Sequence, residues 1–454
     1  MARARAASTV IWFRRDLRTA DHPALLAAVD EARSSGGRVA PLFVVDDTLL
    51  ASGGANRLAF LAGTLAALDE SLDGSLALRR GRPGDVVPRF AAEVGARTVF
   101  VTGDCAPYGR RRDGAVAASL AEAGRTLARV GSPYAVSPGR VVSGSGSPYR
   151  VFTPFRRAWT EHDLPTPAGA PRGMSWSAAD SDVTVDEVGS GEGTAQLPAP
   201  GEGAALRALD EFLAGPVLHY GDERDRPDLP GTSRLSPHLR LGSVHPRQVL
   251  ARVGSAASSE AFRSELAWRE FYADVLWHHP DSAWQSLAPT GRHLHWDTGE
   301  AADRRFTAWS SGQTGYPLVD AGMRQLRSEG WMHNRVRMLT ASFLVKDLHI
   351  DWRRGARLFL DHLVDGDLAS NNHGWQWVAG TGTDAAPFHR VFNPALQAER
   401  FDPEGAYVAR YVPEAGGPDY PPPIVDHVEE RAEALRRWAD AKVGVAAQAV
   451  PEPR

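Results

Sequence analysis

The sequence has 454 residues, 43% of them hydrophobic and 23% charged, with a formal net charge of −4 at pH 7. A chain of this length exceeds the size at which one hydrophobic core keeps growing, so we expect two domains. The negative net charge argues against a basic nucleic-acid-binding coat, although it leaves room for a local positive groove.

Simple features of the sequence disfavour membrane, secreted and metal-cluster proteins. No apolar segment approaches the roughly 20 residues that span a bilayer, and no signal-peptide hydrophobic stretch follows the basic start, MARARAAS. The single cysteine, Cys105, cannot form an internal disulfide and offers no metal cluster. We therefore expect a cytoplasmic protein with no membrane partner and no bound metal.

The first 135 residues alternate short β-branched runs with helix-like segments. The expected strands are 9–13, 39–45, 76–81 and 98–103, and the expected helices lie around 23–32, 57–68 and Phe90. This alternation predicts an α/β domain over 1–135 with a doubly wound, Rossmann-like parallel sheet covered on both faces. No GxGxxG motif follows a strand, so a nicotinamide site of that type is disfavoured.

The middle of the chain separates this domain from a different kind of sequence. Residues 136–203 are expected to form an interdomain linker, because the part from Pro165 onward is rich in Gly, Pro, Ser and acidic residues. From 204 to 454 apolar residues recur at helical spacing, which predicts a larger, all-helical domain. The clearest helical segments are 204–215, 260–277, 317–331, 335–348 and, near the end of the chain, 426–443.

The first candidate binding segment in the helical half is GTSRLSP. Thr232, Ser233 and Ser236 provide hydroxyls and Arg234 a cation, just before an expected helix whose first free amides favour an anion. The segment can hold a phosphate. The alternative is an ordinary helix N-cap, a position that Ser and Thr commonly occupy.

The second segment is ELAWREFY. Helical spacing places Glu265, Trp268 and Tyr272 on one face, which combines a carboxylate with large aromatic rings. Such a face suits a pocket wall. The alternative is that Trp268 belongs to the core and satisfies its N–H locally.

The third segment is GWMHNRVRM. Asn334 and Met338 are four residues apart and share a helical face, which pairs an amide able to read a base edge with a soft thioether. Arg335 or Arg337 can neutralise a phosphate or pair with a carboxylate. The alternative is a solvated basic face with Met338 in the core.

The fourth segment, DGDLASNNHGWQW, is the most polar. Asp and Asn are poor helix formers, so placing Asp365, Asp367 and Asn371 so close together is unfavourable unless they bind something. Two carboxylates and an amide can bind the polar edge of a flat heterocycle, while Trp375 and Trp377 line the walls. The alternative is a turn capped by Asp and Asn.

Together these segments resemble the DNA photolyase and cryptochrome family, and within it the class I cyclobutane pyrimidine dimer photolyases. The resemblance extends from Val10 to Val425. It rests on WFRRDLR, GTSRLSP, ELAWREF, TGYPLVDAGMRQL, GWMHNRVRM and DGDLASNNHGWQWVAGTGTDAAPFHRVFNP. It implies FAD in a U-shaped form within the helical domain.

By this resemblance, each cofactor contact falls on a position of the four segments or close to them. The residues implied to hold FAD are Tyr220, Thr232, Ser233, Arg234, Leu235, Ser236, Phe262, Arg337, Asp365, Gly366, Asp367 and Asn371. Arg337 is expected to pair with Asp365, and Asn371 to face the flavin nitrogen whose protonation changes on reduction.

The resemblance also implies a chain of indoles, Trp375, Trp352 and Trp296, along which an electron reaches the flavin from the surface. Indole suits this task because it is easily oxidised and packs closely in a core. Trp309 competes with Trp296 as the last member of the chain.

The implied reaction is light-driven repair, in which excited reduced FAD transfers an electron to a flipped-out pyrimidine dimer. The residues implied in catalysis are Glu265, Trp268, Asn334, Met338, Asn371 and Trp377. Those implied to contact damaged DNA are Arg224, Glu265, Trp268, Arg269, Tyr272, Asn334, Arg335 and Trp377.

Two other activities are weighed against repair of cyclobutane dimers. A cryptochrome-type light sensor without repair activity is the main alternative, and it is disfavoured because the whole dimer pocket is present and no long carboxyl-terminal extension is expected. A (6-4) photoproduct enzyme is disfavoured because Asn334 and Met338 stand where that group tends to carry histidines.

A second, antenna chromophore is expected in the amino-terminal domain. VTGDCAPYGRRRD departs from the folate-type pattern, so 8-hydroxy-5-deazaflavin is preferred to methenyltetrahydrofolate, and an empty site is the third alternative. The expected partner is UV-damaged DNA, and the expected oligomeric state is a monomer.

Overall fold

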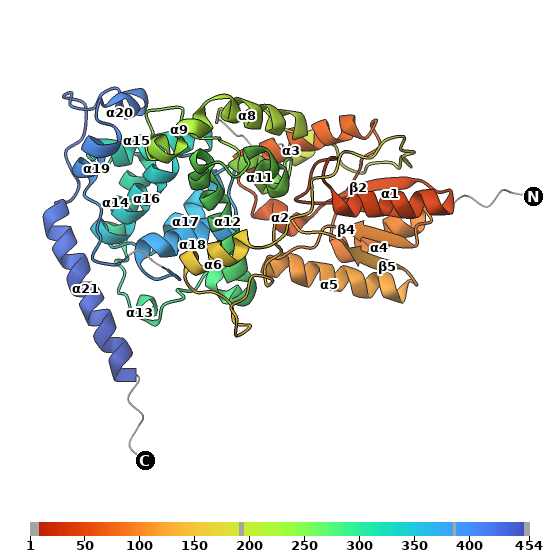
Figure 1. The fold of residues 1–454 in the computed structure, drawn as a ribbon. Helices are drawn as coiled ribbons and strands as arrows, with labels where there is room; N and C mark the ends of the chain where they lie inside the picture. The colour runs from red at the N-terminus through yellow and green to blue at the C-terminus, as the bar shows by residue number, and fades with distance from the viewer. Residues whose placement is uncertain (1–8, 190–194, 385–386, 449–454) are drawn as a thin grey trace, which may run out of the picture.

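The computed structural model describes residues 9–189, 195–384 and 387–448. Parts of three predicted regions lie outside these described residues, namely 1–8 of the first domain, 190–194 of the linker and 449–454 of the helical half, together with 385–386. Figure 1 shows the sheet half at the amino-terminal side and the helical half at the other.

The amino-terminal half is built on a five-stranded sheet. Its strands are β1 (Thr9–Phe13), β2 (Val39–Val45), β3 (Ala77–Arg80), β4 (Thr98–Val101) and β5 (Thr126–Arg129). All pairs are parallel, in the order β3-β2-β1-β4-β5. The predicted doubly wound sheet is thus confirmed. Strand β5 was not predicted, and its four residues, TLAR, are only partly buried or exposed.

Helices cover both faces of the sheet. They are α1 (Pro23–Ser35), α3 (Ala55–Ser71), α4 (Pro83–Glu93) and α5 (Pro107–Glu122), and a short helix, α2 (Asp47–Ala51), follows β2. Ile11 and Phe13 pack with α1 and α3, whereas Val10 and Trp12 pack on the other face with α4 and α5. Successive strand residues point to opposite faces, so a strand buried on both sides is hydrophobic throughout, as β1 is.

Part of the expected linker is folded into the helical half. Residues 152–160 form helix α6 (Phe152–Thr160), which shares a core with α12 (Glu260–His278) through Phe152, Phe155 and Trp159. Further on, the short helix α7 (Val185–Val188) lies against α3. The boundaries of the domains stay predictions.

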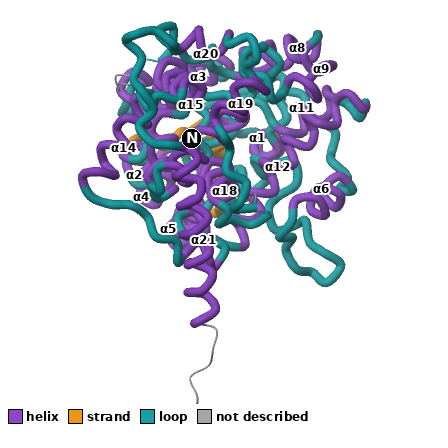
Figure 2. The backbone as a smooth tube through the Cα atoms, turned by 90° about the vertical axis from the view of Figure 1, so that its left-hand side faces the viewer, coloured by secondary structure: helices purple, strands orange, loops and turns teal. Residues whose placement is uncertain are grey.

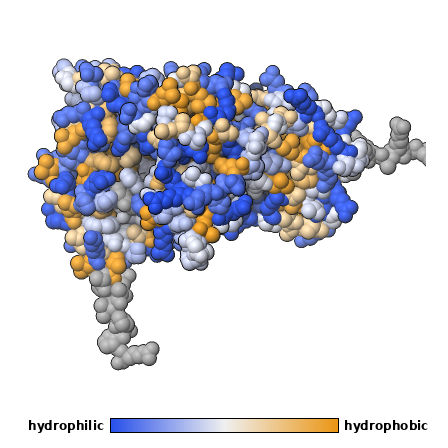
Figure 3. Space-filling view, viewed as in Figure 1, coloured by the Kyte–Doolittle hydropathy of each residue, from blue (hydrophilic) through white to orange (hydrophobic). Residues whose placement is uncertain are grey.

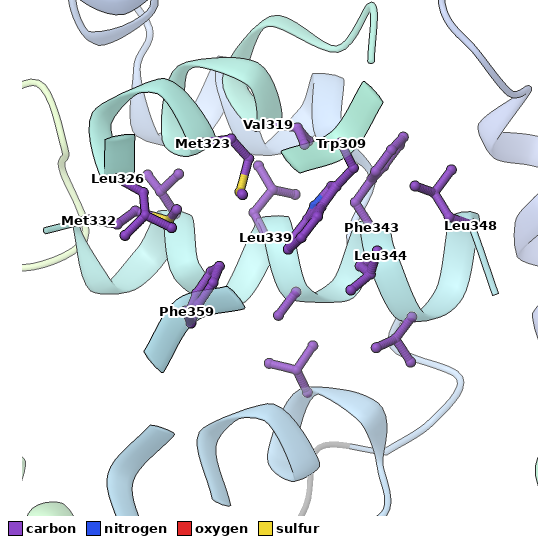
Figure 4. Close-up of a cluster of buried hydrophobic side chains, with 14 of the residues drawn as sticks. Trp309, Val319, Met323, Leu326, Met332, Leu339, Phe343, Leu344, Leu348 and Phe359 are labelled. Atoms are coloured by element: carbon purple, nitrogen blue, oxygen red, sulfur yellow. The ribbon is translucent and has the colours of Figure 1, made fainter. Parts of the chain in front are cut away.

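The second half is helical, as predicted. Its further helices are α8 (Glu202–Ala214), α9 (Pro216–Glu223), α10 (Ser236–Leu241), α11 (Pro246–Val253), α13 (Pro289–Arg292), α14 (Glu300–Ser311), α15 (Pro317–Glu329), α16 (Asn334–Ser342), α17 (Trp352–His362), α18 (Leu368–Ala379), α19 (Pro394–Phe401), α20 (Ala406–Tyr411) and α21 (His427–Gln448). Figure 4 shows the core of this half, where Trp309 lies beside Leu339 and Phe343. Figure 2 shows the end of α21 extending beyond the body of the molecule.

The surface carries mixed polarity, with hydrophilic and hydrophobic residues interspersed over the face drawn in Figure 3. Among the described helices, none combines the length and the apolar character needed to cross a bilayer.

The loop that follows β1 docks the sheet half onto the helical half. Leu17 N–H donates to Leu241 O at 3.1 Å, and the Arg18 guanidinium donates to Gly242 O at 3.0 Å. Gly242 has a φ of +71°, and a Cβ there would lie 2.1 Å from the carbonyl oxygen of Arg15, so only glycine permits this approach. The WFRRDLR motif therefore leads directly into the domain interface.

Candidate active site and cofactor cavity

One cavity of about 500 Å³ opens in the helical half between α9, α10, α12, α16 and α18. Its volume is in the range of cofactor and substrate sites. The sequence-predicted residues that line it are Tyr220, Arg224, Thr232, Ser233, Arg234, Leu235, Ser236, Phe262, Glu265, Trp268, Arg269, Tyr272, Asn334, Arg335, Arg337, Met338, Asp365, Gly366, Asp367, Asn371, Trp375 and Trp377. The four segments, far apart in the sequence, thus meet in one place.

Asp365 is the best-defined polar group of the cavity. Its Oδ2 accepts hydrogen bonds from Arg337 Nη2 at 2.8 Å and from Ser236 Oγ at 2.6 Å. Its Oδ1 is buried, and no donor in the described part of the chain reaches it. A buried carboxylate oxygen without a partner is costly, so this atom fits an N–H of a bound heterocycle. The pair that the resemblance implied, Arg337 with Asp365, is present.

Asn371 presents a single polar atom to the cavity. Its Nδ2 donates to Ala356 O at 3.0 Å and to Asn372 Oδ1 at 2.8 Å. Because the amide hydrogens are used in this way, the side-chain oxygen is the atom that can accept a hydrogen bond from a ligand. This fits a cofactor whose ring nitrogen carries a hydrogen.

Asp367 lines the cavity, but both of its oxygens have protein partners. Its Oδ1 accepts from the backbone N–H groups of Ala369 and Ser370, each at 3.1 Å, and so caps α18. Its Oδ2 accepts from Arg15 Nη2 at 2.6 Å. A direct bond from the Asp367 carboxylate to the cofactor therefore stays a prediction that competes with these contacts.

The GTSRLSP segment does not use its hydroxyls to cap a helix. The N-cap of α10 is Leu235, which makes no side-chain cap bond. Thr232 and Ser233 line the cavity, and Ser236 binds Asp365. Arg234 lies over Trp331, with its guanidinium carbon 4.3 Å from the ring centre. The arrangement leaves hydroxyls at the cavity wall, as a phosphate or ribose site requires.

Helix α12 supplies one aromatic wall. Trp268 is half-buried, lines the cavity and stacks on Phe152 of α6, with ring centres 3.7 Å apart and planes at 10°. Tyr272, one turn later, stacks on His373 at 5.6 Å. Stacking on Phe152 and His373 therefore fixes the positions of the Trp268 indole and the Tyr272 phenol. Phe152 was not predicted as a site residue, because it lies in the segment expected to be a linker.

Replacing Phe152 with leucine is expected to loosen the Trp268 wall. An offset-stacked aromatic pair contributes about 0.5–1.5 kcal/mol beyond burial. For the substrate and cofactor that the resemblance implies, the affinity for dimer-containing DNA should therefore fall roughly two- to tenfold while FAD stays bound. Binding of dimer-containing and undamaged oligonucleotides measures this. Phe155→Leu is the matched control, since Phe155 packs on Phe271 in the same core. An equal loss of dimer affinity in both variants would contradict a specific role for Phe152.

Charged side chains also line the cavity. Arg224 Nη1 lies 2.8 Å from Glu265 Oε1, and Arg335 Nη2 lies 2.5 Å from Asp225 Oδ2. Burial raises the pKa of Glu265, and the attraction of Arg224 opposes this effect. Asn334, on α16, is exposed and directs its amide towards the Met338 sulfur at 4.0 Å, as their spacing predicted.

Arg269 was predicted to contact DNA, but its contacts are internal. Its guanidinium donates to Leu239 O at 3.2 Å and to Pro133 O at 3.4 Å, and lies 4.5 Å from the ring centre of Tyr134. The bond to Pro133 ties α12 to the end of the sheet half, and the bond to Leu239 ties it to α10. Arg224 and Arg335 are the cations at the cavity that are better placed for a phosphate.

The predicted electron chain is only partly at the cavity. Trp375 lines it, whereas Trp352 is buried and donates Nε1–H to Ser286 Oγ at 3.3 Å. Trp296 is half-buried. Trp309 is fully buried, donates to Thr340 O at 3.0 Å and lies edge-to-face with Trp375 at 6.2 Å between ring centres.

Several cavity residues were not predicted. The most informative are Asp225, Arg240, Trp331, Phe359 and Gly374. Trp331 and Gly374 lie in the third and fourth candidate segments. Arg240 is four residues after Ser236 and Gly374 is three before Trp377, so helical spacing predicts that each lies on the same face as a site residue. Asp225 and Phe359 carry no local signal, because an acidic loop residue and an apolar helix residue are common everywhere. Within the described ranges, no group of three or more His, Cys, Asp or Glu is arranged to hold a metal ion.

Two ranges of the chain match known protein-family models. Residues 9–172 match the family model described as "DNA photolyase", and residues 262–418 match "FAD binding domain of DNA photolyase". A "Deoxyribodipyrimidine photo-lyase" from Streptomyces griseus is 43% identical over 93% of this chain and 97% of its own length.

Solved structures share the whole fold. A bacterial class III photolyase from Agrobacterium tumefaciens superposes with a TM-score of 0.90 at 37% identity, covering 97% of this chain and 99% of that one. A cryptochrome from Synechocystis sp. gives 0.85 at 26% identity, covering 96% and 99%. The match to a class III enzyme gives no support to the expected class I subclass. On the strength of the near-full-length relatives, the chain belongs to the photolyase/cryptochrome family.

Proposed function

We propose that this protein is a light-driven DNA repair enzyme, a deoxyribodipyrimidine photo-lyase that splits cyclobutane pyrimidine dimers with FAD. The observation that carries the proposal is the cavity of the helical half, which joins polar groups suited to a flat heterocycle with an aromatic wall and with arginines. The photo-lyase from Streptomyces griseus, 43% identical over nearly the full length, supports the same activity.

When bound and reduced, FAD would supply on excitation by light the electron that opens the cyclobutane ring and would take it back afterwards, so that the reaction has no net redox change. The residues of the protein bind and orient the cofactor and the substrate. Asp365 and Asn371 orient the cofactor, each by an oxygen able to accept an N–H. The hydroxyls of the GTSRLSP segment hold its phosphate and ribose parts. No general base is required, so positioning and electrostatics are the protein's contribution.

Trp268 and Trp377 form the walls for the extruded dimer, and Glu265, Asn334 and Met338 contact its polar edge. A damaged, poorly stacked dinucleotide costs less to extrude than a normal one, and contact with aromatic walls offsets part of that cost. Arg224 and Arg335 attract the phosphates. On release from Arg224, the Glu265 carboxyl becomes available to the pyrimidine.

We assign the electron path to Trp375, Trp352 and Trp296. The terminal donor exchanges electrons with solvent components, so it has to reach the surface. Trp296 is half-buried and Trp309 fully buried, which favours Trp296 as the last member of the chain. Trp309 contacts Trp375 directly and is the candidate for a side branch.

An antenna chromophore in the sheet half remains part of the proposal, with 8-hydroxy-5-deazaflavin preferred to methenyltetrahydrofolate or an empty site. The small cavity at the ends of β1 and β4, lined by Arg14, Asp16, Thr102 and Asp104 among others, is only about 10 Å³. That volume suits roughly one water molecule, so a chromophore of this kind would have to bind elsewhere in the sheet half. Absorption spectra of extracted pigment distinguish the three alternatives.

Three finer assignments belong to the same proposal. We propose that the enzyme acts as a monomer and in the cytoplasm. The class I subclass stays a prediction from the sequence motifs.

The decisive experiment illuminates purified, reduced protein with dimer-containing DNA. Pyrimidines should be restored under blue or near-ultraviolet light and not in the dark.

Trp268→Ala should weaken binding of the dimer roughly tenfold, since contact of a base with an aromatic ring contributes about 1–3 kcal/mol. Binding to dimer-containing oligonucleotides, measured with and without the substitution, checks this.

The matched control is Trp277→Ala, on the same helix α12, where the indole lies under Arg110 at 3.9 Å and does not line the cavity. It should leave dimer binding unchanged. If light restores no pyrimidines although FAD is bound, the protein is a sensor of the cryptochrome type and the proposal fails.

A further inference from the structure

An ion pair joins the two halves of the molecule, and one of its two residues, Asp367, lines the cavity. Arg15 follows β1 in the sheet half, and Asp367 precedes α18 in the helical half, 352 positions later. Arg15 Nη2 donates to Asp367 Oδ2 at 2.6 Å, and the two side chains are only 20% and 12% exposed. A partly buried, charge-assisted bond of this kind is among the stronger polar contacts in proteins.

The same carboxylate holds the start of α18. Its Oδ1 accepts the first free N–H groups of the helix, those of Ala369 and Ser370. Burial alone would raise the pKa of Asp367, but Arg15, Arg240 and Arg269 hold this pKa well below its usual range. The group is therefore an anion at a helix N-terminus, where the helix dipole stabilises it.

Helix α18 carries the cavity residues whose positions matter most. Asn371 N–H bonds to Asp367 O at 2.8 Å, so the amide that faces the cofactor lies one turn beyond the cap. Trp375 and Trp377 follow on the same helix. A shift in the start of α18 moves the cofactor acceptor, the first indole of the electron path and one wall of the dimer pocket together.

The loop that bears Arg15 is itself held in place. Leu17 N–H bonds to Leu241 O, and the missing Cβ of Gly242 lets the loop backbone come close to the helical half. Arg240, the other nearby cation, cannot replace Arg15, because its Nε donates to Gly366 O at 2.8 Å and lies 3.9 Å from Asp367 Oδ2. Arg15 is thus the cation that contacts the cap directly.

We infer that Arg15 is a positioning residue for the cofactor cavity: from the sheet half, it fixes Asp367 and through it the start of α18 and the amide of Asn371. The inference rests on the proposed function, because it concerns the binding of FAD. It gives the sheet half a part in the active site that is independent of any antenna pigment.

The test compares Arg15→Met with Arg247→Met. Arg247 also joins the two halves, through Asp21 at 2.9 Å, and its pair is similarly buried, at 12% and 2% exposed, but it does not contact α18. Three quantities are measured on the full-length protein: the dissociation constant of FAD, the visible circular dichroism of bound FAD and the thermal unfolding midpoint. Repair activity is recorded separately.

Arg15→Met should raise the FAD dissociation constant about tenfold, the effect of losing one hydrogen bond to a charged group, and should change the visible circular dichroism. Arg247→Met should lower the unfolding midpoint and leave both FAD readouts unchanged. Arg15→Lys should give an intermediate dissociation constant, because lysine keeps the charge but not the planar geometry of arginine.

Unchanged FAD affinity and dichroism in Arg15→Met, or the same changes in Arg247→Met, would overturn the inference. Should Arg15→Met fail to fold, Arg15→Lys decides, since an FAD dissociation constant identical to that of the wild type contradicts a positioning role. Failure of the wild-type protein itself to bind FAD would instead refute the proposed function.

Discussion

Replacing Trp375 with phenylalanine is expected to abolish light-driven reduction of oxidised FAD while leaving repair by the chemically reduced enzyme intact. Trp375 is buried, and of the three members of the predicted electron chain it is the one that lines the cavity. Benzene is much harder to oxidise than indole, so the first step of the path is lost. Absorbance at the flavin bands under steady illumination with an external reductant measures the photoreduction.

The substitution removes aromatic volume as well as an electron donor, so the packing has to be controlled. Trp375 contacts Phe359 edge-to-face at 4.9 Å, and the ring rests against Gly355. Phenylalanine keeps an aromatic ring there, at a stability cost of about 1–3 kcal/mol. Trp277→Phe, outside the cavity, should photoreduce normally. Equal loss of photoreduction and of repair by dithionite-reduced enzyme would show that Trp375 is structural rather than a redox group.

The sheet and the site residues could be predicted because their signals are local. β1 and β2 are continuous hydrophobic runs, which mark strands buried on both faces. Most of the predicted cavity residues lie in four short segments whose polar or aromatic side chains are out of place in a simple helix. Motifs of that kind need no knowledge of long-range contacts.

The contacts that hold the site residues in place from other parts of the chain could not be predicted. Phe152 and Trp268 are more than 100 residues apart, and Arg15 and Asp367 are 352 apart. The spacing of residues along the chain does not predict such long-range contacts, because they depend on how the domains pack. β5 and α6 were missed for a related reason, since β5 is short and α6 lies in a region whose average composition is that of a connector.

Asp367 illustrates the same limit. Its place in a polar segment marked it as a ligand of the cofactor, whereas its oxygens cap α18 and bind Arg15. The segment was correctly located in the cavity. Which aspartate contacts the ligand and which supports the helix depends on where a distant arginine lies, and only the fold determines that.

Asp365→Asn is expected to reduce FAD binding more strongly than any other single change in the cavity. Asp365 is buried, its charge balances Arg337, and its Oδ1 has no hydrogen-bond partner in the described part of the chain. The amide keeps the shape but removes the charge, so a hydrogen bond to a charged group, about 1.5–3 kcal/mol, is lost on each side. The FAD dissociation constant should rise roughly 10- to 100-fold, measured by flavin fluorescence.

A double-mutant cycle separates the two contributions. If Asp365 acts mainly by holding Arg337, then Arg337→Met should weaken FAD binding as much as Asp365→Asn, and the double variant should add little. If Oδ1 binds the cofactor directly, Asp365→Asn should cost more than Arg337→Met. Asp361→Asn, at the exposed end of α17, is the control and should bind FAD normally. Wild-type affinity in Asp365→Asn would remove Asp365 from the cofactor site, because a buried acceptor that serves a ligand cannot lose its charge without effect.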